Sequence, residues 1–173
     1  SKKRNSIFRD SENFIIDNGK TNHKGIEFTL DLKINETSNL ISNFTYGDHK
    51  YDFDSDTSMR EKIRIGNKID TSPKLMANLI LNTSINDNVS LAFELEHMDS
   101  YYTDAANLHE YEGHTLMYFR SNLNYSEKLK FYLRIDNLTD KDYAERADFN
   151  AFGGDRYFPG LPRETYVGLE YSL

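Results

Sequence analysis

Hydrophobic and polar residues alternate with a period of two along most of this chain. The pattern is unbroken over residues 163–173. One side of this run carries Thr165, Val167, Leu169, Tyr171 and Leu173, and the other side carries Glu164, Tyr166, Gly168, Glu170 and Ser172. Because successive side chains of a strand point to opposite faces, the run predicts a β-strand with one face against an apolar environment.

The same alternation predicts further strands, separated by polar turn sequences. They cover residues 25–34, 40–53, 75–85, 89–96, 117–125 and 129–136. A weaker run over residues 7–17 is predicted to join the strand at 25–34 through the turn-forming residues Asn18, Gly19 and Lys20. The chain is therefore predicted to be all-β, as an antiparallel meander of about eight strands.

The connections between these strands fall into two length classes. Short turns at 35–39, 86–88 and 126–128 alternate with long loops at 54–72, 102–113 and 137–162. Outer-membrane β-barrels have short periplasmic turns at one end of their strands and longer external loops at the other end. This sorting of the connections favours a membrane barrel over a soluble sandwich.

The predicted polar faces of the strands are charged and rich in amides. They carry Glu27, Asp31, Lys33, Asn78, Asn82, Glu94, Glu96, Arg120, Arg134 and Asp136. Because unpaired charges are costly in hydrocarbon, this face is predicted to line a wet lumen while the apolar face meets lipid. Glu94 and Glu96 have the spacing of a carboxylate pair, but we expect Arg120 and Arg134 to neutralise them in a ladder of lumen charges.

Tyrosines flank the predicted apolar band. Tyr125 and Tyr171 lie near the short turns, and Tyr46, Tyr51, Tyr101 and Tyr102 lie near the long loops. Two aromatic girdles of a barrel would place tyrosines there. The general preference of tyrosine for strands explains the same positions.

Composition narrows the classes of function. The chain has 173 residues, of which 38% are hydrophobic, and a mean hydropathy of −0.73, which a barrel tolerates because only alternate strand residues face lipid. Cysteine is absent, which excludes disulfides, zinc–thiolate sites and thiol nucleophiles. The net charge of −7, without a basic stripe, disfavours a nucleic-acid partner. Because an initiator methionine and a signal-peptide pattern are both missing, we expect residues 1–173 to be a segment of a longer protein.

Two stretches near the end of the chain resemble a known family. Residues 137–143 (NLTDKDY) and 156–163 (RYFPGLPR), followed by the closing strand, closely resemble the C-terminal end of TonB-dependent outer-membrane receptors. Residues 19–21 (GKT) with 25–27 (GIE) resemble another stretch of the same barrels. The similarity extends over the whole chain and is most specific at its C-terminal end.

This resemblance implies a fold, a location and a set of partners. The fold would be a 22-stranded transmembrane β-barrel with an N-terminal plug, in the outer membrane of a Gram-negative bacterium. Residues 1–173 would be the C-terminal part of that barrel, with the plug and the earlier strands absent from this chain. The partners would be a ferric siderophore or another scarce nutrient complex, the lipid bilayer, and TonB, which acts through the missing plug region.

No catalytic residue, metal site or cofactor is predicted. His109 and His114 are five residues apart rather than four, and Gly113 would break a helix that aligned them, so a zinc-protease site is disfavoured. His23, His49 and His97 are isolated in the sequence and are expected to be polar strand residues rather than ligands. The chain is therefore expected not to be an enzyme.

The long loops supply the candidate ligand-binding residues. Aromatic rings and arginines in these loops offer flat apolar surface and bidentate cations, which suit an anionic or aromatic iron chelate. The candidates are Tyr101, Tyr102, His109, Tyr111, His114, Arg146, Phe152, Arg156 and Tyr157. Aromatic-girdle tyrosines and solvated arginines are the structural alternative for each of them.

Two alternative functions stay open at this point. The first is a self-contained eight-stranded outer-membrane barrel, either adhesin-like or lipid-modifying, because eight strands can close a barrel. The second is a soluble β-sandwich binding module. In a sandwich, Phe28, Leu81, Phe93, Phe131 and Leu169 would converge on one dry interior between two layers.

Overall fold

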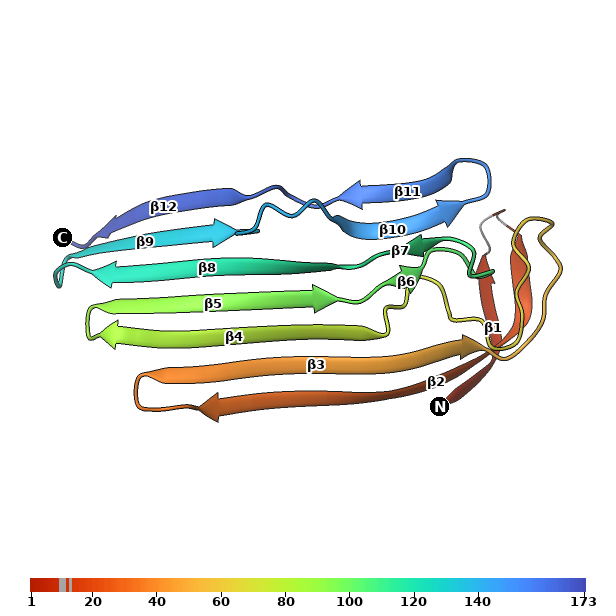
Figure 1. The fold of residues 1–173 in the computed structure, drawn as a ribbon, viewed down its shortest axis with the longest axis horizontal. Coiled ribbons are helices and arrows are strands. Elements are labelled where there is room, and N and C mark those ends of the chain that lie inside the picture. The colour runs from red at the N-terminus through yellow and green to blue at the C-terminus, as the bar shows by residue number, and fades with distance from the viewer. Residues whose placement is uncertain (10–11, 13) are drawn as a thin grey trace.

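The structure is a computed structural model that describes residues 1–9, 12 and 14–173, and every regular element among them is a β-strand (Figure 1). The strands are β1 (Lys2–Arg9), β2 (Ile15–Lys33), β3 (Ser38–Tyr51), β4 (Leu75–Asn86), β5 (Val89–Met98), β6 (Tyr101–Tyr102), β7 (Glu110–Tyr111), β8 (His114–Asn124), β9 (Leu129–Asp136), β10 (Ala144–Asn150), β11 (Gly154–Pro159) and β12 (Glu164–Tyr171). No helix long and apolar enough to cross a membrane occurs among these residues.

Eight of the strands form one antiparallel sheet, in the order β1-β2-β3-β4-β5-β8-β9-β12. This order follows the chain, and it confirms the predicted meander. The remaining four strands form two small hairpins, β6–β7 and β10–β11. The sheet is open, because β1 and β12 each pair with one described neighbour only.

The register gathers the apolar side chains on one face of the sheet. Leu81 lies opposite Leu40 on β3 and opposite Phe93 on β5, and Phe93 in turn lies opposite Phe119 on β8. These side chains do not converge on a dry interior: the Phe93 side chain is 45% exposed, and those of Phe28 and Leu169 are 54% and 60% exposed. A single layer with one exposed apolar face is the arrangement of a barrel wall, and it excludes the sandwich alternative.

The opposite face carries the charges, and its pairs lie across neighbouring strands. Glu94 accepts hydrogen bonds from Arg120 Nη1 at 2.9 Å and from Asn78 Nδ2 at 2.7 Å. The Tyr118 hydroxyl donates to Glu96 at 3.1 Å. Arg120 therefore neutralises Glu94 as predicted.

The expected role of Arg134 in this ladder is wrong. Its guanidinium lies 2.7 Å from Asp136, on its own strand, and the ring of Tyr166 lies 5.6 Å from the guanidinium carbon. Because Asp136 is two residues away on the same face of β9, it is closer to Arg134 than any carboxylate of β5.

Side chains of the turn residues close the short hairpins. The Asn35 side-chain oxygen accepts the backbone N–H of Thr37 at 2.9 Å. The Asn86 side-chain oxygen accepts the backbone N–H groups of Asn88 and Val89 at 2.9 and 3.0 Å. Such local bonds satisfy turn amides without a longer loop, and these turns lie together at the left-hand end of the sheet in Figure 1.

The predicted N-terminal strand over residues 7–17 is wrong in its bounds. β1 ends at Arg9 and β2 begins at Ile15, so Asn18, Gly19 and Lys20 lie inside β2 rather than in a turn. The β1–β2 register shifts on both sides of Ser6, and Asn18 has φ of 57°. Asparagine tolerates this left-handed conformation, so the Asn-Gly pair forms a bulge in a continuing strand. Residues 10, 11 and 13 of the predicted strand lie outside the described residues.

The long connections gather at the other end of the sheet and pack there (Figure 1). Two of them contain hairpins that the sequence pattern did not indicate. The β6–β7 hairpin spans residues 101–111, and the β10–β11 hairpin spans residues 144–159. One buried cluster joins Ile16, Tyr51, Ile63 and Ala105, and a second joins Tyr101, Tyr111, Ala144 and Ala147. The packed cores of this chain therefore lie in its loops.

We predict that residues 1–173, expressed alone, aggregate in water. The apolar face would meet solvent, and the unpaired edges of β1 and β12 would be open to pairing with other copies. Size-exclusion chromatography with light scattering, with and without detergent, measures the outcome. A monodisperse monomer that melts cooperatively in detergent-free buffer would contradict the prediction.

Candidate ligand-binding site

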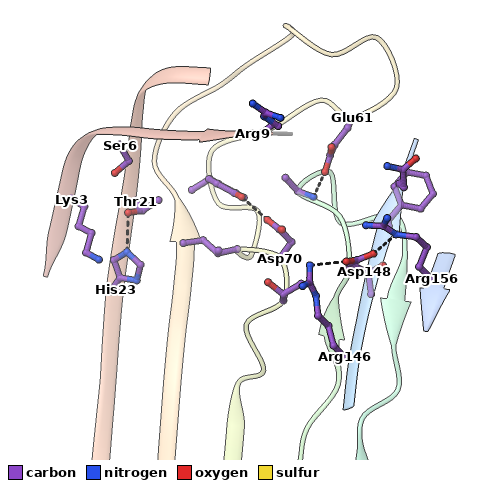
Figure 2. A pocket seen from close by; sticks show the side chains of 17 residues that line it. Lys3, Ser6, Arg9, Thr21, His23, Glu61, Asp70, Arg146, Asp148 and Arg156 are labelled. Carbon is purple, nitrogen blue, oxygen red and sulfur yellow. Dashed lines mark hydrogen bonds and ion pairs between the residues drawn. The ribbon is translucent and has the colours of Figure 1, made fainter. Parts of the chain in front are cut away.

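A cavity of about 510 Å³ lies at the loop end of the sheet (Figure 2). Segments far apart in sequence line it: β1, the start of β2, the loop before β4, the loop after β6, and the β10–β11 hairpin. Its lining includes the cationic Lys3, Arg9, Arg146 and Arg156, the acidic Glu61, Asp70 and Asp148, and His23. The cavity is therefore polar, with cations on two opposing sides.

Two arginines on one side share a single carboxylate. Asp148 on β10 accepts a hydrogen bond from Arg146 Nη2 at 2.7 Å and another from Arg156 Nε at 2.6 Å. Asp148 is buried, whereas the side chains of Arg146 and Arg156 are 65% and 50% exposed. Since each guanidinium carries five donors, both keep N–H groups free to face the cavity while their orientation is fixed.

Two buried tyrosines hold the hairpin that carries these arginines. The Tyr101 hydroxyl accepts the N–H of Ala147 at 2.8 Å and donates to the carbonyl of the same residue at 3.2 Å. The Tyr111 hydroxyl does the same with Ala144, at 3.0 and 3.3 Å, and lies 2.8 Å from His114 Nδ1. These three predicted ligand residues therefore lie within the loop core and position the hairpin.

The remaining predicted residues do not line the cavity. The His109 ring stacks on Phe149, a lining residue, at 3.9 Å between ring centres, and its Nδ1 is 3.1 Å from Asp155. Lys68 lies over the Tyr102 ring and Arg60 over the Phe152 ring. Tyr157 is 55% exposed. Of the nine predicted residues, only Arg146 and Arg156 line the cavity.

Two acidic residues that line the cavity, Glu61 and Asp70, accept hydrogen bonds, and burial shifts the pKa of Asp70. The Tyr51 hydroxyl donates to Asp70 Oδ1 at 2.6 Å, and the N–H of Ala105 donates to Glu61. Loss of water around the Asp70 carboxyl raises its pKa, and the nearby Glu61 and Asp104 charges raise it further, although the Tyr51 hydrogen bond acts in the opposite direction. Burial at this position therefore disfavours the ionised form of Asp70.

Two further cations at the cavity, Lys3 and Arg9, come from β1 and are not among the residues predicted from the sequence. Lys3 and Arg9 both line the cavity, and neither forms an ion pair with another described residue. In Figure 2, Lys3 lies on the side opposite the arginine pair, and Arg9 lies between the two sides, near Glu61. Lys3 lies near the start of β1 and Arg9 at its end, and β1 pairs with β2. Their place at the cavity depends on that pairing.

Two histidines that are isolated in the sequence form a pair between neighbouring strands. His23 on β2 lies directly opposite His49 on β3, and their Nδ1 atoms are 3.0 Å apart. The His23 Nε2 lies 2.8 Å from the Thr21 hydroxyl. No group of three or more His, Asp or Glu side chains able to hold a metal ion occurs in residues 1–9, 12 and 14–173.

A family model described as TonB dependent receptor-like, beta-barrel, matches residues 1–138 of the chain. The chain belongs to the TonB-dependent receptor family. Barrels of this family are outer-membrane proteins of Gram-negative bacteria, and its members are transport receptors. A comparison with curated proteins gives no match.

Solved receptor structures share the fold of this TonB-dependent receptor segment. The siderophore receptor PiuA from Acinetobacter baumannii superposes with a TM-score of 0.80 at 19% identity, over 98% of this chain and 24% of PiuA. The ferric-catecholate import receptor Fiu from Escherichia coli K12 gives 0.73 at 19% identity, over 97% and 23%. The ferric preacinetobactin receptor BauA from Acinetobacter baumannii gives 0.69 at 22% identity, over 98% and 26%. The chain thus spans about a quarter of the length of these receptors.

We predict that Asp70→Asn stabilises the loop over residues 52–72 at pH 8. The amide keeps an acceptor for the Tyr51 hydroxyl and removes a buried charge. Because the folded pKa of Asp70 lies above 3.8, its stabilising contribution is complete below pH 3.8 and is lost as the pH rises through the folded pKa. The expected result is several-fold slower proteolysis of this loop in the full-length variant at pH 8, with the difference narrowing near pH 4.5. Identical pH profiles for variant and wild type would contradict this.

Proposed function

We propose that residues 1–173 form the C-terminal part of the barrel of an outer-membrane receptor that imports a ferric siderophore or a similar scarce nutrient complex. The plug, the TonB box and the earlier strands would lie elsewhere in the protein. On this proposal the segment supplies barrel wall and external loops, is energised by TonB through the plug, and catalyses no reaction of its own.

The observation that carries the proposal is the arginine pair at the loop-end cavity. Arg146 and Arg156 are oriented by the buried Asp148 and keep donors free, in a cavity that also receives Lys3 and Arg9. An anionic iron chelate presents carboxylate or catecholate oxygens, which guanidinium groups bind with charge-assisted hydrogen bonds. The solved receptors with the same fold include PiuA, Fiu and BauA, whose names refer to siderophore or ferric complexes.

The polar face of the sheet supports the same proposal. The pairs between Arg120 and Glu94 and between Tyr118 and Glu96 tie charged groups to one another across strands, on the face that lacks the apolar stripe. A hydrated lumen beneath a cationic binding cavity suits the passage of a polar complex. The alternative of a self-contained eight-stranded barrel is not favoured, because β1 and β12 do not pair with each other in the described structure.

Growth tests the function of the whole receptor. A strain lacking the full-length gene is expected to lose growth under iron limitation on one or more members of a siderophore panel, and the restored gene is expected to recover it. Unchanged growth across every siderophore and nutrient complex tested, in a strain without redundant receptors, would contradict the proposal.

We predict that Arg146→Ala and Arg156→Ala in the full-length receptor each weaken binding of that siderophore about tenfold or more. A hydrogen bond to a charged group contributes roughly 1.5–3 kcal/mol, so its loss corresponds to at least such a factor. Isothermal titration calorimetry of the purified receptor with the siderophore measures the dissociation constants. The matched control is Arg64→Ala, because Arg64 lies in a loop, pairs with Asp56 and does not line the cavity. Equal effects of all three substitutions would contradict a specific role for the pair.

A further inference from the structure

A cluster of four lysines lies on the outer wall of the sheet, near its loop end. Lys24, Lys50, Lys68 and Lys74 surround a hollow of about 480 Å³, together with Gly25, Ile26, Tyr46 and Asp48. This hollow is distinct from the loop-end cavity and shares no lining residue with it. We call these four residues the lysine cluster.

The strand register places the lysine cluster on the apolar face. Ile26 lies opposite Tyr46, and Lys24, two residues before Ile26, lies on the same face of β2. Lys50 lies on the face of β3 that carries Tyr46, and a bridge between Lys50 and Lys68 extends that face into the loop. The Lys74 ammonium lies 5.2 Å from the centre of the Tyr46 ring. The cluster therefore continues the apolar stripe toward the long loops, which lie at the right-hand end of β2 and β3 in Figure 1.

The charges of the lysine cluster are not balanced within the hollow. Four lysines face one lining carboxylate, that of Asp48, which lies 3.0 Å from Lys50. The local net charge of the lining is therefore +3 (four minus one), in a chain whose net charge is −7. Like charges held together repel one another, and an anion between them would relieve the repulsion.

The position of the cluster points to a lipid headgroup. Ile26 is 68% exposed and Tyr46 is 39% exposed, at the upper limit of the apolar stripe that includes Phe28 and Phe44. Lys24 lies about 7 Å and Lys50 about 13 Å beyond that limit along their strands. Long lysine side chains can pack their methylenes on apolar surface while their ammonium groups reach polar headgroups.

We propose that the lysine cluster binds the phosphate groups of the phosphorylated glycolipid that forms the outer leaflet, the lipopolysaccharide. This inference rests on the outer-membrane location in the proposed function. The acyl chains would lie along Ile26 and Phe28, and the phosphates would lie among the ammonium groups. A phospholipid headgroup region is only about 5–8 Å deep, so a cluster that reaches about 13 Å above the stripe fits the deeper headgroup of a glycolipid.

Binding of defined lipopolysaccharide to the purified full-length receptor tests the proposal. The receptor in detergent micelles is titrated with lipopolysaccharide that carries both lipid A phosphates, with its dephosphorylated form, with phosphatidylglycerol and with inorganic phosphate. Native mass spectrometry measures the number of bound molecules and their affinity. The variant combines Lys24→Gln, Lys50→Gln, Lys68→Gln and Lys74→Gln. The matched control makes the same change at Lys33, Lys128, Lys130 and Lys141, which do not line the hollow.

The expected result is binding of phosphorylated lipopolysaccharide that is at least tenfold weaker in the cluster variant and unchanged in the control. The dephosphorylated form is expected to bind all three proteins equally weakly. Unchanged affinity in the cluster variant would overturn the proposal, as would equal losses in the control. Equally tight binding of phosphatidylglycerol or inorganic phosphate would overturn the assignment to a glycolipid.

Two further measurements separate failure of folding and failure of the proposed function from failure of this inference. Heat-modifiable migration on gels reports whether each variant folds. If the fourfold variant does not fold, it is replaced by the double variant Lys68→Gln with Lys74→Gln, whose positions lie outside the regular strands. The double variant is expected to show a smaller loss of the same lipid selectivity. Siderophore titration of the same samples is expected to be unchanged by the cluster variant. Loss of lipid selectivity with intact siderophore binding supports the inference, whereas intact lipid selectivity without any siderophore binding would reject the proposed function alone.

Discussion

One hydrogen-bonded sheet separates an apolar face from a charged, hydrated face, and this separation determines where the other parts of the chain pack. Within a bilayer, each backbone N–H and C=O group needs a partner, and antiparallel ladders supply those partners between β1 and β12, except along the outer edges of these two strands. Side chains then have two environments only. Phe93 and Phe119 meet across β5 and β8 on one face, while Arg120 and Glu94 meet across the same two strands on the other.

This constraint explains why the packed cores lie at the end of the sheet rather than within it. Lipid covers the apolar face in a membrane, so Phe28 or Leu169 needs no protein partner there. Above the membrane, water replaces lipid, and the loops bury their own apolar groups, such as Ile63 at 0% exposure and Ala147 at 0%. Tyr101 and Tyr111 carry this packing into the hairpin that presents the arginine pair, so loop stability and ligand geometry depend on the same contacts.

Local alternation made most of the sheet predictable from the sequence, because a period of two is set by each strand alone. The bounds at the N-terminus were not predictable, because Asn18-Gly19 is equally suited to a turn and to a bulge, and pairing with β1 selects the bulge. The β10–β11 hairpin escaped detection because its strands carry little apolar alternation and are held by tyrosines from a distant loop. In the site, Arg146 and Arg156 were identifiable as loop cations, but Lys3 and the His23–His49 pair were not, since pairing between strands brings them into place.

The environment of single side chains in the membrane shows whether the apolar face meets lipid and the charged face meets water. Residues 1–173 contain no cysteine. A nitroxide label can therefore be attached at one introduced cysteine at a time, in a full-length receptor from which any cysteine outside this segment has been removed. Electron paramagnetic resonance of the reconstituted protein then compares accessibility to oxygen, which concentrates in lipid, with accessibility to a polar nickel chelate. Labels at Phe28, Phe93 and Leu169 are predicted to favour oxygen, and labels at Thr29, Glu94 and Glu170 to favour the chelate. Loss of this alternation along any of the three strands, or its inversion, would contradict the account.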